Sequence, residues 1–395
     1  MKIPKSIFGK EDNDIEKFNE LDLDERSIVF YSESSVILYP YVEEIIEELQ
    51  NRDQKICYLT SSKYDPILKN KNENIKVFYI GDSELEKMNF FLRLKARILI
   101  MTMPDLGAYH IKRSKEFPVH YIYTFHSMNS THMEFQKDAF DQFDSIFCVG
   151  PYQVQELRAT EQLYNLKQKN LVECGYGLLD KLIKLRSSFS EKKNFLKNNK
   201  KNILIAPSWG KHNLLESMGI ELVKILLDAG YHVTVRPHPM TIRKWPKKIK
   251  AIKNEFDNEP NFEMETDVSS FESIYSAYGL ISDWSGIAIE YAFVCEMPVF
   301  YIDVSQKINN SSYNKIQCNP LEFSIRNLIG KIISPNDLSS LPKVIESTYE
   351  ENNNFKTIIQ EVRNKTIFNL GQSGIKGAQE ILQILDKKKT NKNYV

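Results

Sequence analysis

Histidines follow two short β-rich runs of this sequence. His126 follows residues 119–124 after one phenylalanine, and His238 lies with Arg236 in an RPHP segment that ends another run. A histidine at the tip of a strand can take a proton from an incoming hydroxyl group. An arginine beside it, held by prolines, offers a planar guanidinium for phosphate oxygens. We predict that His126 and His238 are catalytic and that Arg236 binds phosphate, the alternative being ordinary polar loops.

The segment SDWSG, residues 282–286, joins an apolar run to a helical pattern. Such a junction puts the start of a helix, with its unpaired N–H groups and positive dipole end, at the carboxyl end of a strand. That arrangement suits a phosphate or diphosphate, and we predict that Ser282, Ser285 and Gly286 line its site. The simpler alternative is that serine and aspartate cap the helix while glycine relaxes the turn.

Two further segments of the second half add candidates. Ser208 and Trp209 belong to APSWG, which ends a predicted strand, so Ser208 can approach the same phosphate. Glu290 lies just over one turn into the helix after SDWSG, where a carboxylate can accept hydrogen bonds from ribose hydroxyls. We assign Glu290 and Trp209 to the ribose and base of a nucleotide. A surface role for Glu290 is the alternative.

The first half supplies candidates for the side of the site that meets a second substrate. Ser127 and His132 follow His126 in the hydroxyl-rich segment HSMNSTH, and Gly150 starts the turn after the predicted strand 145–149. We assign Ser127, His132 and Gly150 to this acceptor side. His132 lies further along the turn, so packing or helix capping is its alternative.

Metal and nucleotide signatures of other enzyme classes are missing from the sequence. No cluster of histidine and carboxylate residues has metal-site spacing, and the DLD at residues 22–24 follows no strand. There is no Walker loop and no GxGxxG. We therefore predict no metal ligands and no obligatory cofactor.

Short β-runs alternate with helical segments along most of the chain. This alternation predicts an α/β fold with two doubly wound, Rossmann-like domains and a cleft between the carboxyl ends of their sheets. The predicted strands are residues 27–31, 55–59, 75–80, 98–101, 119–124, 145–149 and 171–175 in the first half, and 202–206, 232–236, 262–264, 279–281 and 299–302 in the second.

Composition shifts give the domain boundaries. The predicted parts are a polar leader over residues 1–26, an acceptor domain over 27–185, a lysine-rich linker over 186–201, a nucleotide-donor domain over 202–375, and a helix end with a frayed tail over 376–395. A length of 395 residues agrees with two domains.

Charge and cysteine usage restrict the function classes. Lys+Arg and Asp+Glu both total 52, so no net positive field attracts nucleic acid. The five cysteines stand singly, as in reduced cytoplasmic proteins. No signal peptide and no apolar run long enough to span a membrane is present. We predict a cytoplasmic protein and leave open both self-association and peripheral docking at the membrane's inner face through the basic patch 243–248.

Taken together, the motifs resemble the CDP-glycerol glycerophosphotransferase family, the teichoic-acid primases and polymerases. The resemblance runs from about residue 119 to 302. It rests on FHS at 125–127, where the family usually has a WHG-type motif, on GYGLLD at 175–180, on APSWG at 206–210, on RPHP at 236–239 and on SDWSGIAIEYAF at 282–293. Ser127 stands where the family commonly has glycine.

The resemblance implies a GT-B arrangement and a CDP-linked donor. By this resemblance His126 deprotonates the acceptor hydroxyl, and His238 and Arg236 hold the donor diphosphate. The SDWSG residues close on the phosphates, and Glu290 meets the ribose. The implied reaction transfers glycerol phosphate, or a related polyol phosphate, to a hydroxyl of a surface glycan or lipid-linked acceptor and releases CMP.

Three other functions fit the same patterns. The first is a GT-B glycosyltransferase that uses a CMP- or UDP-linked sugar for capsule, O-antigen or another surface polysaccharide. The second is a sugar-nucleotide epimerase, and the third is a non-catalytic nucleotide-binding partner of a glycan assembly complex. Release of CMP from CDP-glycerol distinguishes the transferase from all three.

Overall fold

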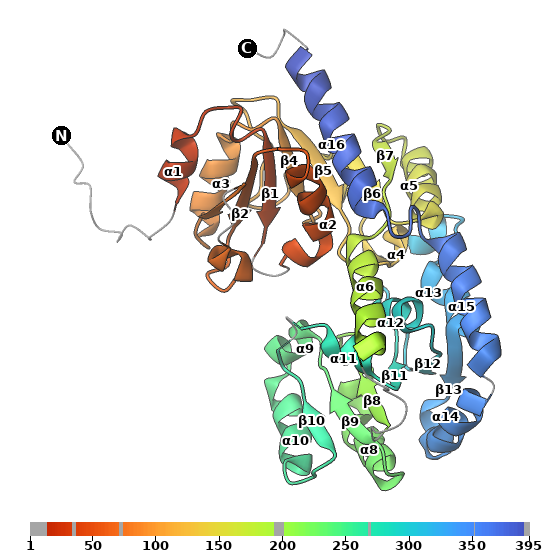
Figure 1. Cartoon of the computed structure of the whole chain (residues 1–395). Coiled ribbons are helices and arrows are strands. Elements are labelled where there is room, and N and C mark those ends of the chain that lie inside the picture. The colour runs from red at the N-terminus through yellow and green to blue at the C-terminus, as the bar shows by residue number, and fades with distance from the viewer. Residues whose placement is uncertain are drawn as a thin grey trace.

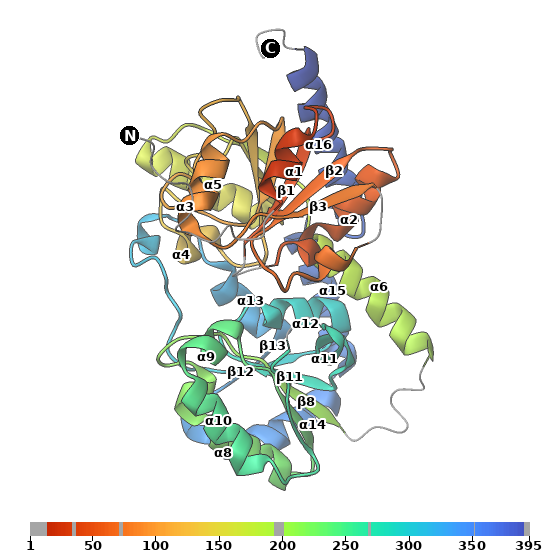
Figure 2. The same ribbon diagram turned by 90° about the vertical axis from the view of Figure 1, so that its left-hand side faces the viewer.

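Two parallel-sheet α/β domains make up the molecule (Figures 1 and 2). The computed structural model describes residues 14–33, 37–70, 74–192, 201–267, 270–350 and 352–390. The first domain has a seven-stranded sheet of order β3-β2-β1-β4-β5-β6-β7, and its strands are all parallel. These strands are β1 (Ile28–Ser32), β2 (Ile56–Thr60), β3 (Ile75–Tyr79), β4 (Ile98–Met101), β5 (His120–Thr124), β6 (Ser145–Cys148) and β7 (Asn170–Glu173).

The second domain repeats the same winding with six parallel strands in the order β10-β9-β8-β11-β12-β13. They are β8 (Asn202–Ile205), β9 (His232–Val235), β10 (Phe262–Met264), β11 (Gly279–Ser282), β12 (Val299–Ile302) and β13 (Gly330–Ile333). In each sheet the strand order reverses once, between β1 and β4 and between β8 and β11. Such switch points are where open α/β sheets bind ligands, outside the carboxyl ends of the strands.

Helices cover both sheets and join the domains. They are α1 (Ile15–Glu20), α2 (Tyr39–Gln50), α3 (Glu84–Leu92), α4 (Thr131–Glu134), α5 (Pro151–Tyr164), α6 (Gly177–Lys192), α8 (Leu214–Asp228), α9 (Pro239–Lys244), α10 (Pro246–Phe256), α11 (Glu272–Ser276), α12 (Ile287–Cys295), α13 (Leu321–Ile329), α14 (Leu341–Glu350), α15 (Asn352–Thr366) and α16 (Ser373–Thr390), with 3₁₀ turns η1 (Pro66–Lys69), η2 (Tyr313–Lys315) and η3 (Pro335–Ser340). α6 contacts both α2 of the first domain and α12 of the second, so it spans the junction (Figure 1).

The sequence explains the local structure. The central strands read as unbroken apolar runs because both faces are covered, as parallel sheets require; every residue of β1, β2, β4 and β6 is buried. Prolines stand in the first turns of α2, α5, α9 and α10, where the missing N–H costs nothing.

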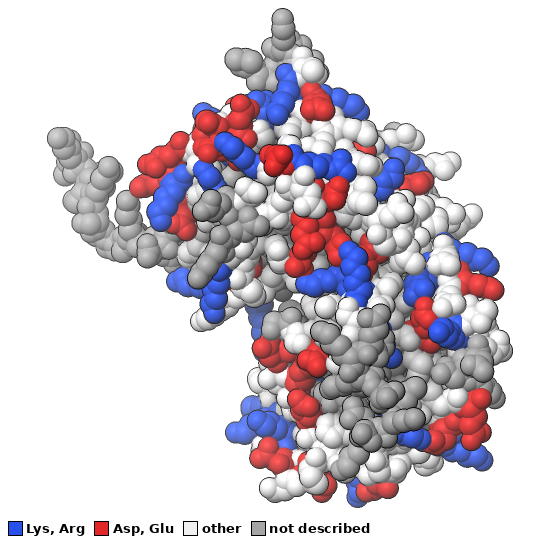
Figure 3. All heavy atoms as spheres, in the orientation of Figure 1, with Lys and Arg blue, Asp and Glu red and all other residues white. Residues whose placement is uncertain are grey.

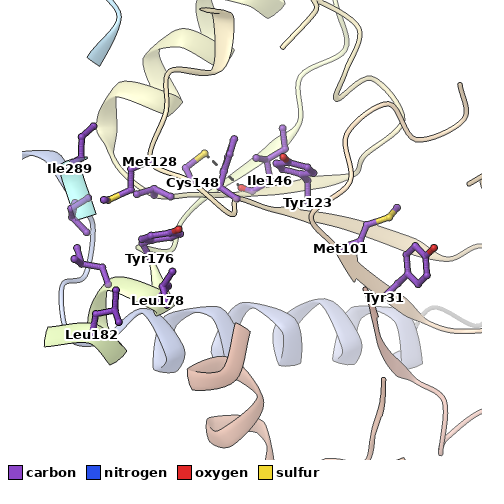
Figure 4. Packing of buried hydrophobic residues seen from close by; sticks show 14 of the residues in the cluster. Tyr31, Met101, Tyr123, Met128, Ile146, Cys148, Tyr176, Leu178, Leu182 and Ile289 are labelled. Carbon is purple, nitrogen blue, oxygen red and sulfur yellow. Dashed lines mark hydrogen bonds between the residues drawn. The ribbon is translucent and has the colours of Figure 1, made fainter. Parts of the chain in front are cut away.

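One apolar cluster runs through both domains. It includes Tyr31 and Tyr123 of the first sheet as well as Ile289 of α12. Figure 4 shows Met128 and Tyr176 of the first domain at the end of the cluster nearest Ile289. Because apolar burial is continuous across the junction, the two domains are held together by more than the covalent chain.

Three boundary predictions differ from the structure. The polar leader contains α1, whose Phe18 is fully buried with Phe78 and Phe90 at ring-centroid distances of 5.5 Å. The predicted linker begins inside α6, which continues to Lys192. Residues 376–390, predicted as a helix end with a frayed tail, are all part of helix α16 (Ser373–Thr390), which packs on α2 of the first domain. β13 was not predicted either. The leader before residue 14, the linker residues 193–200 and the tail beyond residue 390 lie outside the described residues.

The surface agrees with the balanced composition. Charges of both signs are interspersed over the face seen in Figure 3. Four of the five cysteines are buried and Cys318 is partly exposed, and all five are free thiols. Across the described ranges, no helix combines the length and apolarity needed to cross a membrane.

Candidate active site at the domain junction

His126 stands just beyond the carboxyl end of β5, next to the switch point of the first sheet. Its Nδ1 lies 2.8 Å from the hydroxyl of Thr102, which follows the neighbouring strand β4. Burial, and then the charge of Lys307, lower the pKa of His126 to about 4. The ring is therefore neutral at pH 7. When Nδ1–H donates to Thr102, Nε2 carries the lone pair that a general base needs.

His238 lies at the equivalent edge of the second sheet and caps helix α9. Its Nδ1 accepts a hydrogen bond of 3.0 Å from the backbone N–H of Met240. The proton of the neutral ring consequently sits on Nε2, which makes His238 a hydrogen-bond donor. Burial, then Lys307, then His126 lower the pKa of His238 to about 4. The charge of His126, when protonated, is therefore one of the causes that act on the pKa of His238 from the other domain.

Helix α12 begins at the same junction. Ser285 and Gly286 are partly exposed there, and no side chain caps the helix. A Cβ placed on Gly286 would lie 2.8 Å from Oδ1 of Asn129 and 3.6 Å from Cβ of Ser127. The helix start with its unpaired N–H groups therefore faces the loop that follows His126. This arrangement brings Ser127, Ser285 and Gly286 together from two domains.

Ser282 and Asp283 have buried partners of their own. The Ser282 hydroxyl donates to the carbonyl of Ala206 at 2.7 Å. The Asp283 carboxylate accepts from the backbone N–H groups of Ser208 and Trp284, both at 2.7 Å, and Leu214, at 3.3 Å. These bonds tie the loop after β8 to the loop after β11. The geometry favours a positioning role for Ser282, Asp283 and the buried Ser208 over the predicted phosphate contact.

The Arg236 side chain is held by hydrogen bonds within its own domain. Its guanidinium is 2.6 Å from Oε1 of Glu265, 2.8 Å from the carbonyl of Ser270 and 3.2 Å from the Ser273 hydroxyl. The side chain is only 6% exposed. Burial lowers the pKa of Arg236, opposed by the charge of Glu265, and the group stays cationic. A direct diphosphate contact by Arg236 stays a prediction, while its structural role is to hold Glu265, Ser270 and Ser273 together.

Glu290 links the two domains through a buried hydrogen bond. It accepts a hydrogen bond of 2.9 Å from the hydroxyl of Tyr176, which precedes α6. Burial raises the pKa of Glu290 to about 7, opposed by Tyr176 and by the charge of Arg236. Tyr41 packs beside this pair, with its ring centroid 6.2 Å from Tyr176 and 6.1 Å from His126. The ribose contact predicted for Glu290 remains a prediction.

Trp209 has a cationic environment. Its ring lies 6.2 Å from that of His238, and the ammonium groups of Lys244 and Lys307 lie 4.4 and 5.1 Å from its centroid. Sequence reasoning did not single out Lys307, because a lysine in a polar loop far from any motif carries no signal. Its position depends on the chain path after β12. The structure brings it to both histidines.

Two acceptor-side candidates have structural explanations. His132 is buried, with Nδ1 3.4 Å from Oε2 of Glu156 and Nε2 3.2 Å from the carbonyl of Cys318. A Cβ on Gly150 would lie 1.8 Å from the carbonyl oxygen of Thr366, so only glycine fits there. The packing accounts for both residues without a substrate, and the acceptor-side role predicted for them stays a prediction.

A small pocket lies beside Ser285 on the second domain. Trp284, Tyr301, Glu322 and Arg326 are among its lining residues. The Arg326 guanidinium stacks 3.8 Å from the Trp284 ring centroid and pairs with Asp303 at 3.0 Å. Among the described residues no group of three or more histidine, cysteine or carboxylate side chains could hold a metal ion. The absence of an obligatory metal remains a prediction.

Comparison with known proteins decides the family. Residues 17–307 match the family described as CDP-Glycerol:Poly(glycerophosphate) glycerophosphotransferase. The chain belongs to this family. It is therefore a transferase of the CDP-glycerol glycerophosphotransferase type, and the resemblance seen in its motifs is confirmed. No curated protein matches the sequence.

Solved structures confirm the GT-B fold. The wall teichoic acid polymerase TagF, soaked with CDPG, has a TM-score of 0.62 at 14% identity, over 93% of this chain and 90% of that one. UDP-GlcNAc 2-epimerase from Methanocaldococcus jannaschii, with UDP-GlcNAc and UDP, has a TM-score of 0.55 at 12% identity, over 91% and 99%. The lipopolysaccharide glycosyltransferase WaaG has a TM-score of 0.50 at 12% identity, over 90% and 99%. At these identities the likeness concerns the fold alone.

Proposed function

We propose that this glycerophosphotransferase adds glycerol phosphate from CDP-glycerol to a hydroxyl group of a poly(glycerol phosphate) chain, as in teichoic-acid synthesis. This chain is carried by a surface glycan or a lipid-linked precursor, which the enzyme meets at the inner face of the membrane. The observation that carries the proposal is that the start of α12 packs against the loop that follows His126, while His126 and His238, two neutral histidines of different domains, both follow the carboxyl ends of strands.

The two histidines have different roles in this proposal. His126 takes the proton of the acceptor hydroxyl through Nε2, because Nδ1 is occupied by Thr102. His238 donates Nε2–H to a phosphate oxygen, because Nδ1 accepts from Met240. The N–H groups at Ser285 and Gly286 bind the same diphosphate. Asp283 and Arg236 position the surrounding loops.

The reaction balances without an added reagent. The acceptor oxygen forms a bond to the phosphorus that carries glycerol, and the bond from that phosphorus to the bridging oxygen breaks. The bridging oxygen leaves with the electron pair as part of CMP, and the acceptor proton passes to His126. Catalysis by positioning and charge stabilisation is typical of phosphoryl transfer.

CMP release tests the proposal directly. Purified full-length protein is incubated with CDP-glycerol and a poly(glycerol phosphate) oligomer, and CMP and lengthened oligomer are measured by chromatography. We expect both products in equal amounts, and their formation to be slower by about 10² to 10⁴-fold with His126→Ala. Parallel reactions contain CDP-ribitol, UDP-glucose or UDP-GlcNAc. Turnover of a nucleotide sugar without turnover of any CDP-polyol would replace this proposal with the glycosyltransferase or the epimerase.

A further inference from the structure

Lys307 is a cation of the second domain that reaches the first. It lies in the loop between β12 and η2, with Nζ 3.9 Å from Oε1 of Glu134 in α4. The side chain is 20% exposed. Within the described part of the chain its three N–H groups make no hydrogen bond, since its contacts are this long ion pair and the Trp209 ring at 5.1 Å.

Hydrogen bonds to the first domain fix the loop that carries Lys307. Asn309 donates to Oε1 of Glu134 at 2.8 Å. Asn310 donates through its backbone to the carbonyl of Met133 at 3.0 Å, and through its side chain to the carbonyl of His132 at 2.9 Å. The backbone next to Lys307 is therefore held in place, while its ammonium group keeps donor capacity at the junction.

The ammonium group acts on both histidines. Burial is the main cause that lowers the pKa values of His126 and His238, and the charge of Lys307 lowers both further. A partly buried ammonium group whose one carboxylate partner lies 3.9 Å away keeps unsatisfied N–H donors, and an anion that accepts from them offsets the cost of its burial. Its surroundings therefore indicate a phosphate ligand.

We propose that Lys307 binds the phosphate oxygens of the nucleotide donor and stabilises the charge that forms on the departing CMP. The inference rests on the proposed function and adds a residue to it. When the bond from phosphorus to the bridging oxygen breaks, negative charge gathers on that oxygen. Lys307 offsets this charge from the second domain, while His126 accepts the proton of the acceptor from the first.

Three variants of the full chain test the role. Lys307→Met removes the charge at this position, and Lys307→Arg keeps it. The control is Lys244→Met, which removes the other cation above Trp209. Lys244 is exposed, and it is not among the causes that lower the histidine pKa values. We expect Lys307→Met to lower kcat for CDP-glycerol by about 100-fold and to weaken CMP binding measured by calorimetry. Lys307→Arg should regain part of kcat, and Lys244→Met should keep kcat within about twofold of wild type.

Histidine titration by NMR separates this role from a purely structural one. Lys307→Met should raise the pKa values of His126 and His238, and the acid limb of the kcat profile should move to higher pH. Unchanged histidine pKa values and unchanged CMP affinity in a folded Lys307→Met variant would overturn the inference. The proposed function would still stand in that case if the wild-type protein transfers glycerol phosphate from CDP-glycerol. If wild type transfers nothing from CDP-glycerol but loses CMP binding on Lys307→Met, the transferase proposal fails and the phosphate site remains.

Discussion

Asn129 of the first domain lies against Gly286 of the second, so close that a Cβ on Gly286 would be 2.8 Å from Oδ1 of Asn129. The loop after the predicted base His126 and the helix start predicted to hold phosphate therefore meet directly. This contact joins a loop of the predicted acceptor side to a helix start predicted to bind the donor. Glycine is needed at position 286 because a side chain would clash, and not because of its backbone conformation, since its φ is negative.

Gly286→Ala should lower affinity for CDP-glycerol by roughly tenfold, equivalent to about 1.4 kcal/mol, because the added methyl group fills the space between helix start and loop. Calorimetry with CDP-glycerol measures the change. Asn129→Ala in the same chain removes the clash, since that side chain ends at the contact. If the double variant regains full affinity, the clash with Asn129 is the cause, and if it does not, the methyl group blocks the phosphate itself. Wild-type affinity in Gly286→Ala would contradict both explanations.

The histidines should respond differently to substitution. His126→Ala should lower kcat by about 10² to 10⁴-fold, the range for a lost general base, and leave CDP affinity nearly unchanged. His238→Ala should also raise the Kd for CDP, because the Nε2 donor to phosphate is lost. Calorimetry with CDP and steady-state kinetics separate the two effects. Equal losses of CDP affinity in both variants would mean that the assigned roles are wrong.

Arg236→Ala should mainly destabilise the fold. Removing a buried guanidinium leaves the Glu265 carboxylate without its partner, which typically costs about 3 kcal/mol or more. Chemical denaturation measures the loss. The double variant Arg236→Met with Glu265→Leu should regain most of the stability, because both charges are gone. If the double variant is stable but binds CDP weakly, Arg236 also contacts the donor, as the sequence predicted.

Much of the fold follows from the sequence, and the reasons are local. Strands such as β4 and β6 are apolar on both faces and end at turn residues, so their type and limits are visible in the residues themselves. β13 reads GKII, with Lys331 partly exposed and Ile332 exposed, and it follows α13 without a break. Nothing local distinguishes such a segment from the end of a helix.

The site was predictable in part for the same reason. His126, His238, Ser285 and Gly286 follow strands of two sheets, and carboxyl ends of parallel strands share one edge. The partners that occupy Ser282, Asp283 and Arg236 come from loops far along the chain, as Ser208 does for Asp283. Pairings of this kind, and the approach of Lys307, depend on tertiary packing that spacing does not encode.

Stability should fall with rising pH through the titration of Glu290. Below about pH 4.5 its carboxyl group is protonated in folded and unfolded chains alike, and burial raises the folded pKa to about 7. Between these values only the unfolded chain loses the proton, so stability decreases as pH rises and the full loss is reached above about pH 7. A pKa shift of this size lowers the free energy of unfolding by about 3 kcal/mol between these pH limits.

Glu290→Gln should remove this part of the pH dependence. Urea unfolding at several pH values between 4.5 and 8 gives the free energy of unfolding of wild type and variant. The variant should become more stable relative to wild type as pH rises. Glu322, whose pKa burial also raises to about 7, should leave a second contribution in the variant. The exposed Glu361→Gln is the matched control and should leave the profile unchanged. A constant difference across the range would contradict the raised pKa of Glu290.

Helix α16 should be essential for the stability of the first domain, because it packs on α2. Its Ala378, Ile381, Ile384 and Leu385 are buried in one cluster with residues of α2. A Cβ on Gly377 would lie 2.6 Å from Cδ1 of Ile45, so the two helices pack tightly. Ile381→Ala should destabilise the protein by about 2 to 5 kcal/mol, the range for a truncated buried isoleucine. Thermal and urea unfolding measure this loss, with the exposed Gln383→Ala on the same helix as the control. Equal stability of the two variants would show that α16 contributes little to the stability of the fold.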